Sequence, residues 1–288
     1  MEVKKIAVIG GSGQMGQGIC HVAALGGYEV SLRGRTPETC QKAFDGISKN
    51  MFKGVEKGKV SKEEAEAALA RIKTTTSLEE CAKDADFVIE AVPEELKVKW
   101  ETFQALDEIC PGHTVFATNT SSLSITEIFS VTKRTDRCIG MHFFIPVHIM
   151  RLVEIIKGLE TSDETAAVTE AVAKKMGKET VMVNEAPGFA TSRINALIGN
   201  EAFRMLQEGV ASAEDIDKAI KLGLNHPMGP FEMIDMVGLD TRLHTLEYLY
   251  ETLGERFRPN PLHVKYVKAG RLGRKVGKGV YEYPDLKK

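Results

Sequence analysis

The sequence predicts an α/β fold in which a doubly wound sheet is followed by an all-α C-terminal domain. In the first two-thirds of the chain, short runs rich in β-branched residues alternate with helical patterns, as in a parallel sheet covered by helices on both faces. From Thr191 onward the apolar residues recur with the period of a helix instead. The change falls at Pro187-Gly188, so we expect two domains, over residues 1–186 and 187–288.

Seven β-rich runs define the predicted sheet, and helical patterns lie between them. In chain order the β-rich runs cover residues 5–9, 29–33, 86–92, 114–118, 137–142, 152–156 and 180–183. In the C-terminal part, Ser212 with Asp215 three residues later is a helix-capping pattern. Gly270 is a suitable end for the helix that runs through Tyr266.

Composition narrows the classes of partner. The chain has 288 residues, 43% of them hydrophobic, and a net charge of −2, so no strong field favours nucleic acid or a membrane surface. No apolar run approaches the roughly 18 residues needed to span a bilayer. The first predicted strand starts at the beginning of the sequence, which leaves no room for a signal peptide and predicts a cytoplasmic protein.

The cysteines are dispersed and show no CxxC spacing. This pattern predicts reduced thiols that pack in the interior, and it predicts no metal site. The five cysteines are Cys20, Cys40, Cys81, Cys110 and Cys138.

A glycine-rich turn follows the first predicted strand and opens the first helix. The sequence from Gly11 to Gly16 reads GSGQMG, in which glycines allow a tight turn and the helix N-terminus offers free N–H groups to a pyrophosphate. This context is typical of a Rossmann-type sheet, so residues 1–186 are expected to bind a dinucleotide; a glycine-rich turn without a ligand is the alternative. The residues expected at the cofactor are Gly11, Gly13, Gln14, Met15 and Gly16.

The end of the second predicted strand bears on the choice of cofactor. A site that prefers NAD(H) carries an acid there for the ribose hydroxyls, whereas this chain has Arg33 and Arg35 on either side of Gly34. A guanidinium matches a 2′-phosphate well. We therefore expect NADP(H) to be preferred, with NAD(H) left open, because both arginines could instead be solvated.

His142 ends a predicted strand late in the first domain, where reactive groups of open α/β sheets collect. An alcohol that loses a hydride needs a base for its hydroxyl proton, and histidine titrates near neutrality. Glu154 lies in the next predicted strand, where an unpaired carboxylate is costly, so we expect it beside His142 as the group that orients the imidazole. His148 is a rival for the same role.

Hydroxyl groups follow the predicted strand 114–118 in the run Asn119-Thr120-Ser121-Ser122. Ser121 could donate to a substrate oxygen at this strand end. The same residue types also cap helices and form turns, so the run alone leaves both roles open.

Taken together, these segments resemble the 3-hydroxyacyl-CoA dehydrogenase family, closest to the members that act on 3-hydroxybutyryl-CoA, over essentially the whole chain. The order and spacing of many segments carry the resemblance. They are the turn from Gly11 to Gly16, Ile89-Glu90-Ala91-Val92-Pro93-Glu94-Glu95, Asn119 to Ser122, His142-Phe143-Phe144, Leu152-Val153-Glu154-Ile155, Pro187-Gly188-Phe189, His226-Pro227-Met228-Gly229-Pro230 and Gly270-Arg271-Leu272-Gly273-Arg274-Lys275.

The resemblance implies a reaction and residue roles. An L-3-hydroxyacyl-CoA would be interconverted with the 3-ketoacyl-CoA, with His142 as base, Glu154 as its partner and Ser121 positioning the substrate. Residues 187–288 would form a substrate and dimerisation domain, giving a homodimer. The family places three further residues near the cofactor, namely Glu94, Lys99 and Lys275, and Ser121 is expected to contact the cofactor as well as the substrate.

The chain departs from the family pattern at three positions. Gly34 stands where most members have the acid, and Ile145 stands where they have an asparagine. Ser192 replaces the asparagine before Arg193, which is a catalytic position in the family, and Asn195 is a candidate substitute. Ser192 still carries a hydroxyl but lacks the paired donors of an amide.

Lysines recur at every fourth position between the second strand and Arg71, at Lys49, Lys53 and Lys57. This spacing stacks like charges on one helix face, where they repel unless an anion lies against them. The family resemblance assigns contacts with the CoA phosphates to Lys53 and Lys57, and a solvated face is the alternative.

Two other functions fit parts of the pattern. A sugar-acid or 6-phosphogluconate-type dehydrogenase shares the layout, but His142, Glu154 and the lysine face argue against it. A catalytically silent nucleotide-binding protein of the same fold is the second alternative, since Ile145 and Ser192 replace expected polar residues. Acyl-chain length and physiological direction are left undetermined.

Overall fold

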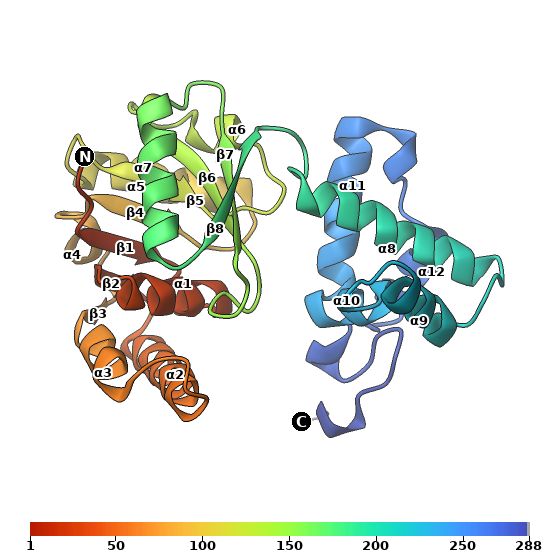
Figure 1. Cartoon of the computed structure of the whole chain (residues 1–288). Coiled ribbons are helices and arrows are strands. Elements are labelled where there is room, and N and C mark those ends of the chain that lie inside the picture. Colours follow the sequence, from red (N-terminus) through yellow and green to blue (C-terminus); the bar gives the residue numbers. More distant parts are fainter. Residues whose placement is uncertain (287–288) are drawn as a thin grey trace. The chain divides into compact units, whose positions relative to one another are not determined.

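The computed structural model describes residues 1–286 and divides into two compact units, Met1–Ala186 and Pro187–Lys288. Each unit is described by itself (Figure 1). The first is an α/β domain and the second is helical, which confirms the predicted fold class.

An eight-stranded sheet forms the centre of the first unit, in the order β3-β2-β1-β4-β5-β6-β7-β8. Its central strands β1, β4 and β5 are buried almost throughout, as continuous apolar runs in a parallel sheet should be. The strands are β1 Lys5–Ile9, β2 Glu29–Arg33, β3 Ile72–Thr75, β4 Phe87–Glu90, β5 Val115–Thr118, β6 Cys138–Phe143, β7 Leu152–Lys157 and β8 Glu179–Asn184.

Helices cover both faces of this sheet. In Figure 1, α1 and α7 lie in front of the strands and α4 and α5 lie behind them, while α2 and α3 pack beside α1. The helices of this unit are α1 Gln14–Leu25, α2 Pro37–Glu56, α3 Lys62–Ala70, α4 Leu78–Ala82, α5 Leu96–Ile109, α6 Ile125–Phe129 and α7 Asp163–Lys175.

Two details of the sheet differ from the sequence prediction. The strand β3 was not predicted, because its four residues are too few to show a period and two of them are exposed. The predicted parallel sheet also contains one antiparallel pair, β6 with β7. The segment between them, residues 144–151, is too short for the helical crossover that a parallel pair requires.

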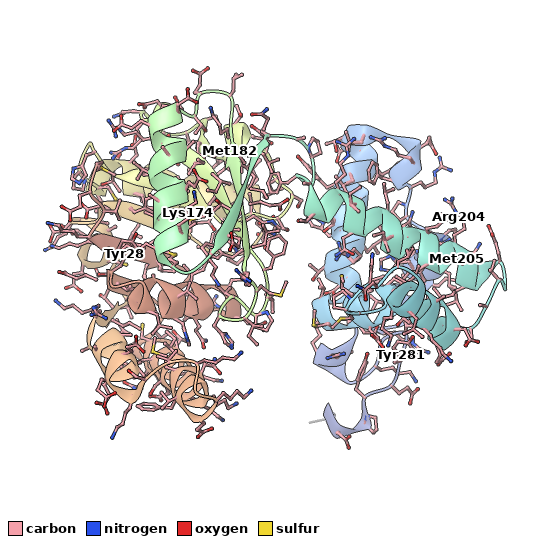
Figure 2. All side chains as sticks on the ribbon, in the orientation of Figure 1. Tyr28, Lys174, Met182, Arg204, Met205 and Tyr281 are labelled. Atoms are coloured by element: carbon pink, nitrogen blue, oxygen red, sulfur yellow. The ribbon has the colours of Figure 1, made fainter. Side chains whose placement is uncertain are left out.

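The second unit consists of helices over its described residues, 187–286, apart from isolated bridges and short 3₁₀ turns. Ser212 Oγ accepts from Asp215 N at 3.1 Å, as the capping pattern predicted. The last segment is fastened by Tyr281, labelled in Figure 2, whose hydroxyl donates to buried Asp217 at 2.8 Å. The helices are α8 Thr191–Gln207, α9 Ala213–Gly223, α10 Pro230–Val237, α11 Leu239–Leu253 and α12 Pro261–Lys268.

The structure bears on two expectations from composition, one about the cysteines and one about membrane-spanning segments. All five cysteines are buried, unpaired thiols, so their predicted packing role is confirmed. Burial raises the pKa of Cys138 to about 12, which makes that thiol unreactive at neutral pH. Among residues 1–286, no helix is both long enough and apolar enough to cross a membrane.

Candidate active site

The antiparallel pairing of β6 and β7 places His142 directly opposite Glu154. The imidazole Nδ1 and the carboxylate Oε2 lie 2.8 Å apart, and the Glu154 side chain is fully buried. A carboxylate at Nδ1 fixes the proton on that nitrogen and leaves Nε2 as the basic atom. The ring of Phe144 packs against the imidazole at 4.5 Å between centroids, so the ring orientation is set from two sides.

A second buried acid, Glu90, lies at the carboxyl end of β4. It accepts from Lys99 Nζ at 2.9 Å and 3.0 Å and from Thr118 Oγ1 at 2.6 Å. The Lys99 side chain is only 1% exposed, so this ion pair is sealed from solvent. Lys99 is therefore buried against the carboxylates that it contacts.

Glu94 connects Lys99 to the hydroxyl-rich turn after β5. Its carboxylate lies 3.3 Å from Lys99 Nζ and accepts from Thr120 Oγ1 at 2.5 Å and from the backbone N of Ser121 at 2.8 Å. Burial by itself raises the pKa of Glu94, but the charge of Lys99 and these hydrogen bonds outweigh it and hold the pKa below its usual range. Glu94 thus remains ionised and keeps the turn in one conformation.

Ser121 lies within reach of this network. Its hydroxyl is 3.3 Å from Glu94 Oε1, and the residue is half-buried. In the structure Ser121 is therefore bound to Glu94 and does not cap a helix. The residue that caps α6 is Ser124. A hydroxyl held at a strand end in this way can be shared with a bound oxygen.

Asn119 joins the turn to the strand that carries His142. Its side-chain oxygen accepts from the backbone N of Phe143 at 2.9 Å. Hydrogen bonds thus connect Lys99, Glu94, the turn and the end of β6. Sequence reasoning did not assign roles to Asn119 or Glu90. A carboxylate inside the apolar run around Glu90 was the available signal, by the same argument that singled out Glu154.

The glycine-rich turn has the geometry that an anion site needs. The helix α1 begins at Gln14, and its N-cap residue, Gly13, has no side chain to occupy the free N–H groups of the first turn. Gly16 packs so tightly that a Cβ there would lie 2.4 Å from the carbonyl oxygen of Gly10. Gln14 is exposed and Met15 half-buried.

The end of β2 brings the two arginines together with a buried glycine. A Cβ on Gly34 would lie 2.6 Å from Cys40 Sγ and 3.1 Å from Thr39 Oγ1, so a side chain here would require these neighbours to shift. Arg33 is half-buried and donates from Nε to the carbonyl of Thr76 at 3.4 Å, and Arg35 is exposed. Within residues 1–286 neither arginine forms an ion pair.

The remaining candidate residues lie on other elements. Lys49 and Lys53 are exposed on α2, and Lys57 is the exposed C-cap of that helix. In the second unit, Lys275 Nζ binds both oxygens of Asp240 at 2.6 Å.

Ser192 and Asn195 lie in the first turns of α8. Ser192 is half-buried, and Asn195 Nδ2 lies 3.0 Å from Met233 Sδ. An apolar pocket of this unit is lined by Asn195 together with Ile194, Ile198, Met228 and Met233, among others.

Comparisons with known proteins cover both units. A family profile described as "3-hydroxyacyl-CoA dehydrogenase, NAD binding domain" matches residues 5–186, and one described as "3-hydroxyacyl-CoA dehydrogenase, C-terminal domain" matches residues 188–283. The chain belongs to the 3-hydroxyacyl-CoA dehydrogenase family. The family resemblance stated from the sequence is thereby confirmed, and with it a nicotinamide-binding first domain.

Individual relatives match over nearly their full length. A "Probable 3-hydroxybutyryl-CoA dehydrogenase" of Bacillus subtilis is 48% identical over 99% of this chain and 99% of its own. The "3-hydroxybutyryl-CoA dehydrogenase" of Clostridioides difficile is 46% identical over 97% and 99%. Among solved structures, the (S)-3-hydroxybutyryl-CoA dehydrogenase of Ralstonia eutropha superposes with a TM-score of 0.93 at 42% identity, covering 98% of this chain and 99% of that one.

Proposed function

We propose that this protein interconverts an L-3-hydroxyacyl-CoA and the corresponding 3-ketoacyl-CoA, with 3-hydroxybutyryl-CoA as the substrate. The observation that carries the proposal is the buried His142–Glu154 pair at the end of β6 in a nicotinamide-binding domain. The names of the relatives support the substrate class. A sugar-acid dehydrogenase and a silent nucleotide-binding protein fit these observations less well.

In the oxidation direction His142 acts as the base. Its Nε2 accepts the proton of the 3-hydroxyl group while the hydrogen on C3 leaves as hydride, so that a C=O bond forms. A bound nicotinamide would supply the acceptor for that hydride. Glu154 stabilises the imidazolium that results and keeps the ring in the required tautomer. In the reverse direction the same imidazolium returns the proton to the carbonyl oxygen.

Ser121 is assigned to the substrate oxygen, because its hydroxyl is held at a strand end by Glu94. Glu94 positions the turn, and Lys99 positions Glu94 from the interior. In the second unit, Ser192 or Asn195 takes the place of the family's asparagine, and Lys275 is assigned to the cofactor.

The cofactor preference is for NADP(H). Arg33 and Arg35 flank Gly34 at the end of β2 and form no ion pair with a carboxylate of the described chain, and Gly34 carries no acid that would repel a 2′-phosphate. The turn from Gly11 to Gly16 receives the pyrophosphate.

The remaining assignments concern the CoA phosphates, the oligomeric state and the cellular compartment. Lys53 and Lys57 contact the CoA phosphates from α2. The helical second unit forms a homodimer interface. The unpaired buried thiols support a reducing compartment, and we place the protein in the cytoplasm.

A steady-state assay with acetoacetyl-CoA, run separately with NADPH and with NADH, tests the proposal. We expect turnover with both cofactors and a lower KM for NADPH. Absence of turnover with either cofactor contradicts the activity, and an equal KM for the two contradicts the preference.

A further inference from the structure

The loop between β6 and β7, residues 144–151, begins directly after the strand that carries His142. It exposes three large apolar side chains, with exposed fractions of 40% for Ile145, 59% for Ile149 and 40% for Met150. We call these three residues the apolar rim. Apolar side chains that gather on a surface beside a functional group mark a binding site more often than isolated ones do.

The loop is held in place by its own backbone. The carbonyl oxygen of Pro146 accepts from the backbone N of both Ile149 and Met150 at 2.9 Å. Lys178 Nζ donates to the carbonyl of Val147 and, at 2.9 Å, to that of Met150. The rim is therefore exposed by a fixed turn, and a loose segment does not account for it.

Val147 fastens the same turn to α1. Its side chain is only 3% exposed and packs on Gly18, where a Cβ would lie 2.6 Å from Val147 Cβ. The loop consequently buries Val147 against α1, while Ile145, Ile149 and Met150 are exposed.

His148 provides a second attachment to α1. Its ring stacks on that of His21, with 5.3 Å between centroids and 25° between the planes. Burial, His148 and Lys178 together lower the pKa of His21 to about 4, so the stacked partner is neutral at physiological pH. Burial and the charges of Lys178, Lys59 and Lys53 also lower the pKa of His148.

We propose that the apolar rim receives the uncharged arm of an acyl thioester, and that the stacking of His148 on His21 holds the rim in position. The inference rests on the proposed function and adds to it the surface that binds the middle of the substrate. The loop follows His142 directly in the chain, Lys178 binds its backbone, and the charges of Lys53 and Lys59 act on its His148. An acyl-CoA offers a reactive acyl group, an uncharged arm and phosphates in the same order.

The rim itself is tested by the double variant Ile149→Ser, Met150→Ser, with Leu159→Ser as the matched control. Leu159 is 79% exposed on the same unit and lies outside the rim. Binding of acetoacetyl-CoA, NADPH and adenosine 3′,5′-bisphosphate is measured by calorimetry. We expect the double variant to weaken thioester binding about tenfold, since a buried methylene contributes about a fourfold factor.

The other two ligands locate the effect. The bisphosphate reproduces the charged end of CoA without the arm, so its affinity and that of NADPH should stay within about twofold of wild type. Equal thioester affinity in wild type and the double variant overturns the proposal. Equal weakening of the thioester and the bisphosphate also overturns it, because the effect then lies outside the uncharged arm.

The role of His148 is tested by a pair of variants. His148→Ala removes the stacked ring, whereas His148→Phe keeps a ring of similar shape without its charge. We expect the KM for acetoacetyl-CoA to rise several-fold in the alanine variant while kcat changes little, and we expect phenylalanine to restore the wild-type KM. A wild-type KM in the alanine variant, or no rescue by phenylalanine in a folded variant, overturns the positioning role.

The wild-type protein separates failure of this inference from failure of the proposed function. If the wild-type protein binds the thioester without turning it over, the proposed activity is contradicted. The calorimetry then still tests whether the apolar rim binds the thioester. If it turns the thioester over and the variants bind like wild type, only the rim fails. If wild type binds no CoA thioester, both are overturned.

Discussion

Two buried acids of the sheet, Glu154 and Glu90, are equally inaccessible but have different partners. Glu154 on β7 faces the imidazole of His142, a group that can exchange a proton with a substrate. Glu90 on β4 faces the ammonium of Lys99, whose pKa burial alone would lower but which Glu90 and Glu94 raise instead. The first pair is suited to proton transfer and the second to a permanent charge. We therefore propose that the partner of the acid, rather than its burial, decides whether such a pair serves proton transfer or positioning.

The largest expected effect comes from removing His142, the partner of Glu154. The change His142→Ala should lower kcat about 10²- to 10⁴-fold, because the hydroxyl proton loses its acceptor. Steady-state kinetics with acetoacetyl-CoA measures the loss. His244→Ala, at an exposed position of the second unit, is the control and should leave kcat unchanged. A similar kcat in both variants would remove His142 from the reaction.

The second effect concerns the permanent charge. Replacing Lys99 by Met leaves Glu90 buried without its cation, which should lower the free energy of unfolding by about 3–5 kcal/mol. Urea denaturation measures this change in the free energy of unfolding. Lys97→Met is the matched control on the same helix, since that side chain is 85% exposed and its pair with Glu101 is a surface one. If both variants unfold at the same urea concentration, the sealed pair contributes nothing specific.

The third effect concerns Arg33 and Arg35, two cations that form no ion pair with an acid of the described chain. The double change of Arg33 and Arg35 to Ala should raise the KM for NADPH about tenfold and leave the KM for NADH nearly unchanged, because only NADPH carries the 2′-phosphate. The two cofactors are compared in the same assay. An equal rise for both would show that the arginines do not distinguish them.

The smallest effect is a pH dependence. The pKa of Glu94 is held below its usual value in the folded protein, so its contribution to stability is fully present above the unfolded pKa of about 4.3 and is lost as pH falls through the folded value. Glu94→Gln should therefore destabilise the protein at neutral pH, and the difference from wild type should shrink in acid.

Thermal unfolding measured at pH 7 and at successively lower pH values tests this expectation. Glu95→Gln is the neighbouring control, since Glu95 is exposed. A constant difference between wild type and Glu94→Gln across this range would show that the ionised form is not what holds the turn.

Much of the candidate site could be predicted from the sequence because it depends on local chemistry. The turn from Gly11 to Gly16 is defined by neighbouring residues, and so is the absence of an acid between the arginines at the end of β2. An acid in an apolar run needs a partner wherever the run lies, which is why Glu154 was identified beforehand. The same reasoning applied to Glu90 would have identified it as well.

Other relations join residues far apart in the sequence, and only the folded chain decides them. The antiparallel register of β6 and β7 makes Glu154 the partner of His142 and leaves His148 against His21 instead. The hydrogen bond from Phe143 N to Asn119 and the burial of Lys99 likewise depend on contacts between distant parts of the sequence. A one-residue shift in register would turn Glu154 to the other face of the sheet, and register is fixed by packing across strands, which no short stretch of sequence encodes.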